Sequence, residues 1–233
     1  PALQISLNGP ANRRGNPNEN LARELLELFS LGEGHYSETD VKEAARALTG
    51  YRQRKGRMQL VPKRHDHGPK TILGRRELFN ATSLVALLCS HPATATAITT
   101  RLWPRLVGAP ANAARIEAIA RDWRRHGLSL PWLVTSLSQT PEARAARRDG
   151  SQLQDPISML ARSLRLLGSR HPDAFNIAMV HLRRMGQAPF EPPSVKGWPV
   201  NEEWLRLRWL LARRRGLAAL LADEEVWESR RPP

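Results

Sequence analysis

Two carboxylates and two imidazoles are the side chains of this sequence with the types and spacing to perform chemistry. Glu24 and Glu27 lie three residues apart in a segment with helical periodicity, so both carboxylates project from one face. His65 and His67 flank Asp66, and in an extended segment their imidazoles point to the same side because side chains alternate with a period of two. Mixed nitrogen and oxygen ligands suit zinc, iron or manganese. The pattern therefore predicts a divalent metal held by Glu24, Glu27, His65 and His67.

The same segments favour, without any metal, an acid–base site made of Glu24, Glu27, His65 and Asp66. An imidazole that titrates near neutral pH and a carboxylate are the usual groups for proton transfer. Four further residues are candidates for binding a ligand beside this site, namely Asn20, Arg23, Lys70 and Trp198. A purely structural interpretation stays open. Arg23 precedes Glu27 by four residues and suits a surface ion pair, and the imidazoles suit a loop cap.

Trp198 differs from the other tryptophans because it lies between Gly197 and Pro199, just after a Pro-rich stretch, rather than in a helical pattern. An indole in such a rigid loop either forms a wall of a pocket or anchors the loop to the core. The sequence leaves both roles open.

Charge favours a second class of function. The chain carries a net charge of +14, from 36 basic and 22 acidic residues. Residues 52–76 hold nine of the basic side chains and one acid, Asp66. This concentration suits a non-catalytic binding or scaffold module for a polyanion, such as a nucleic acid or an anionic polysaccharide, or for a partner protein. Only Tyr51 and Phe79 flank the segment, which is too few aromatic rings for a single-strand stacking platform.

Several classes of protein are excluded by missing motifs. Cys89 is the single cysteine, so no intrachain disulfide forms, and its apolar helical pattern predicts a buried thiol. The sequence contains no Gly-x-Ser-x-Gly elbow and no dinucleotide-binding fingerprint. No apolar run reaches the roughly 18 residues that a membrane span needs. We therefore assign no nucleophile and no transmembrane segment.

The elements that must position these residues are mostly helical. The Asn-, Gly- and Pro-rich composition of residues 1–17 predicts an extended lead-in. A helix is expected to follow over about 18–30, with Leu21, Leu25 and Leu28 on its apolar side. Ser37 begins a second helix as N-cap, with Asp40 completing a capping box. The helical period disappears over residues 51–74, which predicts a short hairpin with its turn at 54–56, or an irregular extended excursion.

The rest of the chain reads as a series of helices separated by Pro and Gly. We expect helices at about 81–90, 92–107, 111–126, 131–138, 141–148, 156–167, 173–185 and 201–221. Proline at the first helical turn marks most of these starts, and Pro104 should kink or shorten its helix. The predicted fold class is all-α, an irregular multi-helix arrangement that forms a single helical domain over residues 1–233.

Three segments, in this order and spacing, resemble the bacterial domain-of-unknown-function family number 1800. The first is 18–28 with Leu31-Gly32, Tyr36-Ser37 and 44–50. The second is 65–74 followed by 91–95. The third is 192–199 with Trp204 behind it. The resemblance departs at Tyr51, where the family tends to have Trp, and at Pro104, where it tends to lack Pro.

The resemblance covers nearly the whole chain and implies that it corresponds to the C-terminal half of a typical member. It implies a partner as well: either a further helical region upstream in the same protein or a second chain, which would cover exposed apolar surface. Family members look exported and neighbour a sulfatase-like companion gene, which implies a periplasmic setting. The family carries no agreed activity, substrate or cofactor.

Overall fold

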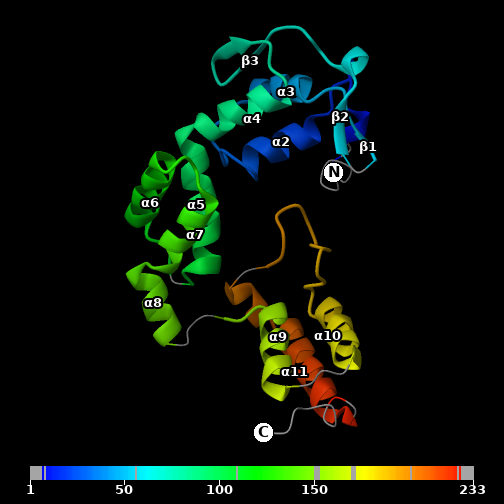
Figure 1. Cartoon of the computed structure of the whole chain (residues 1–233), viewed down its shortest axis with the longest axis vertical. Helices are drawn as coiled ribbons and strands as arrows, with labels where there is room; N and C mark the ends of the chain where they lie inside the picture. Colours follow the sequence, from blue (N-terminus) through cyan, green and yellow to red (C-terminus); the bar gives the residue numbers. More distant parts are fainter. Residues whose placement is uncertain are drawn as a thin grey trace. The chain divides into compact units, whose positions relative to one another are not determined.

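The computed structural model describes residues 7, 9–55, 57–108, 110–149, 153–168, 172–199, 201–224 and 226 (Figure 1). Within these ranges the α-helices are α2 (Glu19–Glu27), α3 (Glu38–Ala47), α4 (Ala81–Ser90), α5 (Pro92–Leu106), α6 (Ala113–Arg125), α7 (Leu130–Ser138), α8 (Pro141–Arg148), α9 (Pro156–Leu167), α10 (Pro172–Arg184) and α11 (Leu207–Ala222). Four short strands form β1 (Tyr51–Arg54), β2 (Arg57–Leu60), β3 (Lys70–Ile72) and β4 (Arg75–Glu77). The 3₁₀ helices are η1 (Gly9–Ala11), η2 (Pro62–Arg64) and η3 (Asn201–Leu205). The predicted all-α class is confirmed.

Two compact units make up the chain. The first contains Pro1–Leu102 and Asn112–Ser136, and the second contains Trp103–Ala111 and Leu137–Pro233. The expectation of one domain over residues 1–233 stays a prediction.

The helix starts agree with the local sequence signals. Ser37 caps α3 and Asp40 returns the bond to the Ser37 backbone, as the capping box predicts. Thr140 and Asp155 cap α8 and α9, each followed by proline at the first helical position. Pro104 lies inside α5, which ends two residues later at Leu106. The predicted helix over 201–221 is wrong in its first turns, because non-helical backbone at Arg206 separates η3 from α11.

The core of the first unit lies between α2, α3, α4 and β3. Its buried side chains include Leu26 of α2, Val41 of α3, Ile72 of β3 and Leu84 of α4. Cys89 is exposed rather than buried as expected, since Leu84, Leu87 and Leu88 already form the inward stripe of α4.

Residues 1–17 were expected to be an extended lead-in, and the described part of this segment folds back instead. After η1, residues Arg13 and Asn16 close a tight turn. Asn12 is buried between them and the core, where its Nδ2 donates to the carbonyl of Ala45 at 2.9 Å. Its Oδ1 accepts from the backbone N–H of Asn18 at 2.9 Å. One buried amide therefore fastens this segment to both α2 and α3.

The excursion between α3 and α4 consists of two hairpins. The predicted hairpin is β1–β2, in which Tyr51 pairs with Leu60 and Arg54 pairs with Arg57. A second hairpin, β3–β4, follows it and was not predicted. Its turn is made by Leu73 and Gly74 at φ of 50° and 76°, and leucine at a positive φ is not a turn signal in sequence.

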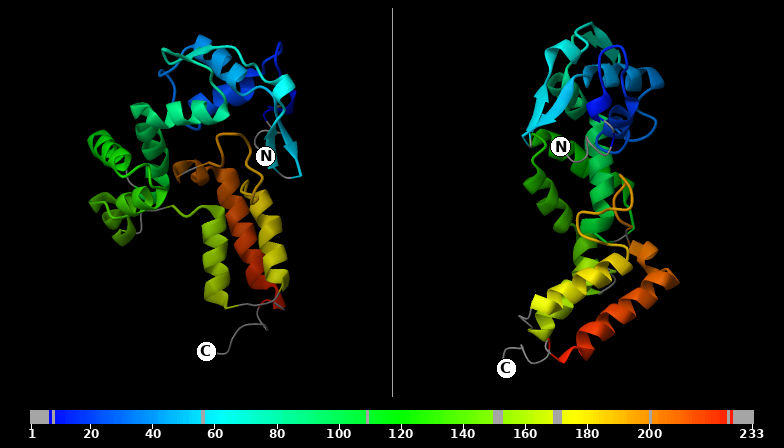
Figure 2. Two further views of the ribbon diagram at one scale, coloured as in Figure 1. Left: turned by 45° about the horizontal axis from the view of Figure 1, so that its top comes forward. Right: turned by 90° about the vertical axis from the view of Figure 1, so that its right-hand side faces the viewer.

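The second unit contains α9, α10 and α11, which lie side by side (Figure 2). They bury Leu160 of α9, Leu182 and Met185 at the end of α10, and Leu220 of α11. The unit also leaves Phe190, Leu166 and Leu207 at least 71% exposed. The chain or partner expected to cover apolar surface stays a prediction.

No single helix in the described part of the chain has the length and apolar character to cross a membrane. Helices α4 and α5 reach the required length and apolar character only when taken together, and they are bent by 78° at the break between them.

Gly50 provides a direct test of how the first unit is closed. Its φ is +81°, and an added Cβ would lie 2.8 Å from the backbone nitrogen of His65 and 3.0 Å from the carbonyl oxygen of Val61. Gly74 has a similar φ of +76° with nothing within 4 Å. We expect Gly50→Ala to destabilise the first unit by roughly 2 kcal/mol more than Gly74→Ala, because only Gly50 adds a clash with backbone to the strain of a positive φ. Amide hydrogen exchange of α2 and α3 measures this, and equal protection in the two variants would contradict it.

Candidate functional site

The loop that carries the His-Asp-His cluster docks on α3. Asp66 accepts from Nε of Arg46 at 2.8 Å and from its Nη2 at 3.3 Å. The Nη1 of the same guanidinium donates to both carboxylate oxygens of Glu43, at 2.8 and 2.9 Å. Glu43 and Arg46 are three residues apart on α3 and therefore share one face. One guanidinium thus binds Asp66 in forked geometry through two nitrogens and Glu43 through a single nitrogen shared by both carboxylate oxygens.

The same face of α3 also accepts hydrogen bonds from the backbone of the β3–β4 hairpin. Glu43 Oε2 accepts from the backbone N–H of Thr71 at 3.0 Å, and Asp40 Oδ1 accepts from that of Leu73 at 2.7 Å. Asp40 carries a lowered pKa: burial raises it, but bonds from Ser37 and Leu73 favour the charged form and prevail. Asp40, Glu43 and Arg46, spaced by one turn each, thus add three contacts from α3 to the segment 66–73: two to backbone N–H groups and one to the Asp66 carboxylate.

The two imidazoles lie together, as the alternation in an extended segment predicts. Their ring centroids are 4.9 Å apart in an edge-to-face arrangement. His65 is buried, and its Nδ1 is 2.9 Å from the carbonyl oxygen of Thr49. His67 Nε2 is 3.0 Å from the carbonyl oxygen of Pro62. Because a carbonyl only accepts, each ring donates an N–H to backbone, which is the loop-capping role left open by the sequence.

Lys70 is buried and directed at its own loop. Its ammonium donates to the carbonyl oxygens of Asp66 at 2.6 Å and Gly68 at 2.9 Å. Burial lowers the pKa of Lys70, partly offset by the carboxylate of Asp66. The ammonium thus satisfies two carbonyls of a loop with no regular ladder. Its role as a ligand-binding residue stays a prediction.

The polar face of α2 has other partners. Arg23 forms a forked pair with Glu38, with both N–O distances 2.7 Å, and a longer contact of 3.3 Å to Glu19. The predicted alternative of an Arg23–Glu27 pair is therefore replaced by links back to Glu19 and across to α3. Glu27 instead accepts from the Tyr36 hydroxyl at 3.2 Å.

Glu24 and Asn20 complete that face of α2. The Glu24 carboxylate has no hydrogen bond or ion pair to any described residue, and Asn20 is exposed at the first turn, where its backbone N–H donates to Asn18. No bond joins either residue to the loop at 65–70 within the described ranges.

The predicted metal ligands are not assembled in the part of the chain that the structure describes. No group of three or more His, Cys, Asp or Glu side chains there is arranged to hold an ion. This applies to the set Glu24, Glu27, His65 and His67. The acid–base role of Glu24, Glu27, His65 and Asp66 stays a prediction.

Trp198 belongs to the second unit. Its carbonyl oxygen lies 3.4 Å from Nη2 of Arg105. Its indole N–H is buried and has no hydrogen-bond partner in the described residues. The Arg105 contact ties the backbone of the Trp198 loop to α5. The role of Trp198 in ligand binding stays a prediction.

A cluster of arginines forms around the first hairpin, β1–β2. Strand alternation and the register place Arg52, Arg54 and Arg57 on one face of β1–β2, with Arg54 directly opposite Arg57. Arg64 follows in η2, and the backbone N–H of Arg14 donates to its carbonyl at 2.8 Å, which brings the folded-back N-terminal segment to the hairpin.

No ion pair with a described residue neutralises the charge of these arginines. Burial lowers the pKa of Arg64, and the neighbouring cations Arg52 and Arg13 lower it further. The Nε atoms of Arg52 and Arg64 are buried with no hydrogen-bond partner in the described residues. The density of basic residues in the sequence indicates the hairpin arginines but not Arg13 and Arg14, because an extended lead-in would not return to the hairpin. We call Arg13, Arg14, Arg52, Arg54, Arg57 and Arg64 the basic cluster.

Fold and site together define a basic, mostly helical protein whose polar residues at 65–70 hold a loop in place. Comparison with known protein families identifies the family of this chain. The family described as "Protein of unknown function (DUF1800)" matches residues 1–230, and the chain belongs to this family. No curated protein and no solved structure matches the chain.

The pH dependence of stability tests the docking on α3. Hydrogen bonds from Arg46 lower the pKa of Asp66. A carboxyl with a folded-state pKa below its unfolded value stabilises the fold above the unfolded pKa, about 3.9 for Asp, and this contribution is lost as pH falls through the folded pKa. We expect Asp66→Asn to cost on the order of 2 kcal/mol at pH 7. The difference from wild type should shrink below about pH 4.

Urea unfolding at pH 7 and at acid pH, followed by amide exchange of β3, measures this difference. Asp122→Asn is the control, because Asp122 forms only an exposed pair with Arg125 and should change stability little at either pH. A cost for Asp66→Asn that is the same at both pH values would contradict the account.

Proposed function

We propose that this chain is a non-catalytic binding module for a polyanion, which contacts the basic cluster of the first unit. The observation that carries the proposal is the pair of buried Nε atoms of Arg52 and Arg64, which lack any partner in the described residues and lie among like charges. Buried donors without partners are costly, and anionic oxygens in repeated spacing would supply the missing acceptors.

The arrangement of the hairpin supports this proposal. Like charges directly opposite each other destabilise an antiparallel pair, yet Arg54 faces Arg57 across β1–β2. Both are exposed, as are Arg13 and Arg14. Planar guanidinium groups bind phosphate, sulfate or carboxylate oxygens in forked geometry. A bound polyanion would therefore relieve the repulsion that the free hairpin carries.

The surroundings of Tyr51 favour recognition by charge rather than by base stacking. The Tyr51 hydroxyl accepts from the backbone N–H of Ala81 at 3.3 Å, and its ring lies edge-on to His65 with centroids 6.4 Å apart. By strand alternation Tyr51 is on the face opposite Arg52. A nucleic acid or an anionic polysaccharide would thus be bound through its charge spacing.

Binding to heparin and to duplex DNA over a range of salt concentrations tests the proposal. The variant Arg52→Gln/Arg54→Gln/Arg57→Gln should bind about tenfold or more weakly at low salt. The slope of log affinity against log salt on DNA should fall in magnitude by about 2 to 3, because each lost phosphate contact removes about 0.9.

A variant of equal net charge separates a local surface from a general charge effect. Arg75→Gln/Arg76→Gln/Arg121→Gln removes three exposed arginines of the same unit outside the basic cluster. It should retain most of the affinity and the salt slope. Equal losses in both triple variants would refute a defined surface, and so would wild-type protein that fails to bind heparin at about 0.15 M salt.

A further inference from the structure

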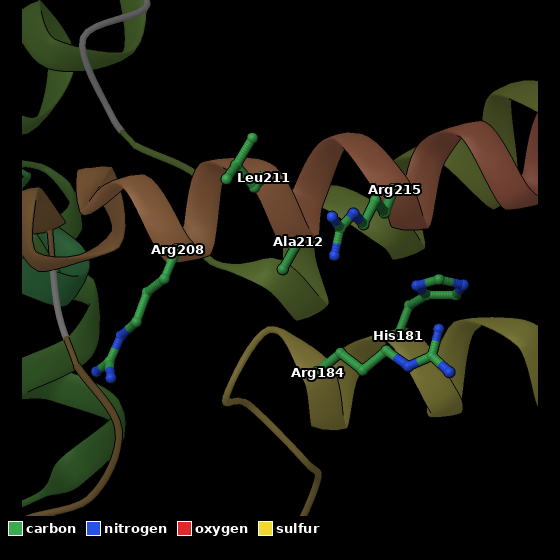
Figure 3. Close-up of a pocket in the computed structure, with 6 residues that line it drawn as sticks. All are labelled: His181, Arg184, Arg208, Leu211, Ala212 and Arg215. Carbon is green, nitrogen blue, oxygen red and sulfur yellow. The ribbon is translucent and has the colours of Figure 1, made fainter.

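A second cationic site lies in the other unit, between α10 and α11. A pocket of about 390 Å³ opens there, lined by His181 and Arg184 of α10 and by Arg208, Leu211, Ala212 and Arg215 of α11 (Figure 3). This volume is within the range of pockets that hold small molecules. Four of the six lining side chains carry nitrogen donors, and none is an acid.

No acid among the described residues pairs with the cations of this pocket. Arg184, Arg208 and Arg215 form no ion pair with any described residue, although Arg183, next to Arg184, pairs with Glu191 at 3.3 Å. Arg208 lies over the ring of Trp209, 4.2 Å from its centroid, which holds the plane of the guanidinium and leaves its N–H edges free. The site is therefore an arrangement of donors that lacks an acceptor.

His181 provides the independent sign of a ligand. It is only 7% exposed, and its Nδ1 is buried with no hydrogen-bond partner in the described residues. Figure 3 shows its ring beside the guanidinium of Arg184, in the space between the two helices. Burial lowers the pKa of His181, and the charge of Arg184 lowers it further.

Gly216 explains why the histidine fits this close to α11. A Cβ at Gly216 would lie 3.1 Å from Cβ and 3.3 Å from Cγ of His181, closer than ordinary van der Waals contact. The absent side chain lets the imidazole pack against the α11 backbone while it lines the pocket. His181 is thus held in place by packing.

We propose that this pocket binds the phosphate group of a small phosphorylated molecule. Arg184, Arg215 and His181 donate to the phosphate oxygens, Arg208 extends the positive field at the other end, and Leu211 with Ala212 contact the organic part. Guanidinium forks match phosphate geometry, and a neutral imidazole still offers one N–H. This site is separate from the proposed function, because it uses none of the basic cluster.

Titration calorimetry of the full chain with inorganic phosphate and with glycerol phosphate tests the proposal directly. Arg184→Gln and Arg215→Gln should each weaken binding by about tenfold, since each removes a charge-assisted hydrogen bond. Arg214→Gln is the matched control: it is exposed, lies beside Arg215 on α11, does not line the pocket, and should bind like wild type. Equal losses in Arg214→Gln and Arg215→Gln would overturn the site.

Two further arms identify the source of the phosphate and the role of the histidine. Vesicles with phosphatidic acid, compared with phosphatidylcholine alone, distinguish a lipid headgroup from a free metabolite, and absence of binding to every phosphate probe refutes the proposal.

Sulfate keeps a fixed charge near neutral pH, so its affinity should rise as pH falls through the pKa of His181, with Arg184, Arg208 and Arg215 charged throughout. His181→Gln should abolish that rise, and a rise that persists in this variant would overturn the assignment of His181. The Arg52→Gln/Arg54→Gln/Arg57→Gln variant should bind phosphate normally, so that this site can fail or survive independently of the basic cluster.

Discussion

The first unit depends on the docking of residues 66–73 against one face of α3. This segment has few ladder bonds of its own, and buried backbone groups without partners are costly. Asp40 and Glu43 accept from backbone N–H groups of this segment, and the ammonium of Lys70 donates to two of its carbonyls. Arg46 holds the segment through the Asp66 carboxylate. Of the candidate site residues, His65, His67 and Lys70 therefore each bond backbone carbonyls. The loop in turn closes over Gly50, whose missing side chain lets the chain pass within contact distance.

Counter-charge is unevenly distributed as a result. The forked pairs Arg23–Glu38 and Arg46–Asp66 engage acids at the junctions of α2, α3 and the loop. Six arginines around β1–β2 have no such pair in the described residues, and the same is true of three arginines between α10 and α11. A net charge of +14 alone says little about function, but cations that pair with no described acid, beside buried donors without acceptors, support our proposals for where anions bind.

Local signals in the sequence predicted much of the fold. Ser37 with Asp40 and the prolines of α8 and α9 located helix starts, because caps act within one turn. The candidate site was harder, since it depends on which helix the loop meets. Periodicity shows that α2 and α3 both have polar faces but not which one is covered by residues 66–73. Likewise, the positive φ of Leu73 accompanies a bond from its N–H to Asp40, and the return of the N-terminal segment accompanies a bond from the Arg14 N–H to the Arg64 carbonyl. Both depend on tertiary contacts. From the sequence alone, Gly216 indicates only a residue that destabilises its helix. The structure shows that the absent side chain makes room for His181.

The central claim is that the basic cluster is the surface on which a polyanion binds. Amide hydrogen exchange of the full chain, with and without a saturating heparin oligosaccharide, tests it most directly because it maps contact without changing any residue. The account predicts slowed exchange in residues 13–16 and 51–64, with β3–β4 unchanged. Slowed exchange confined to other segments, or none at all under saturating ligand, would contradict it.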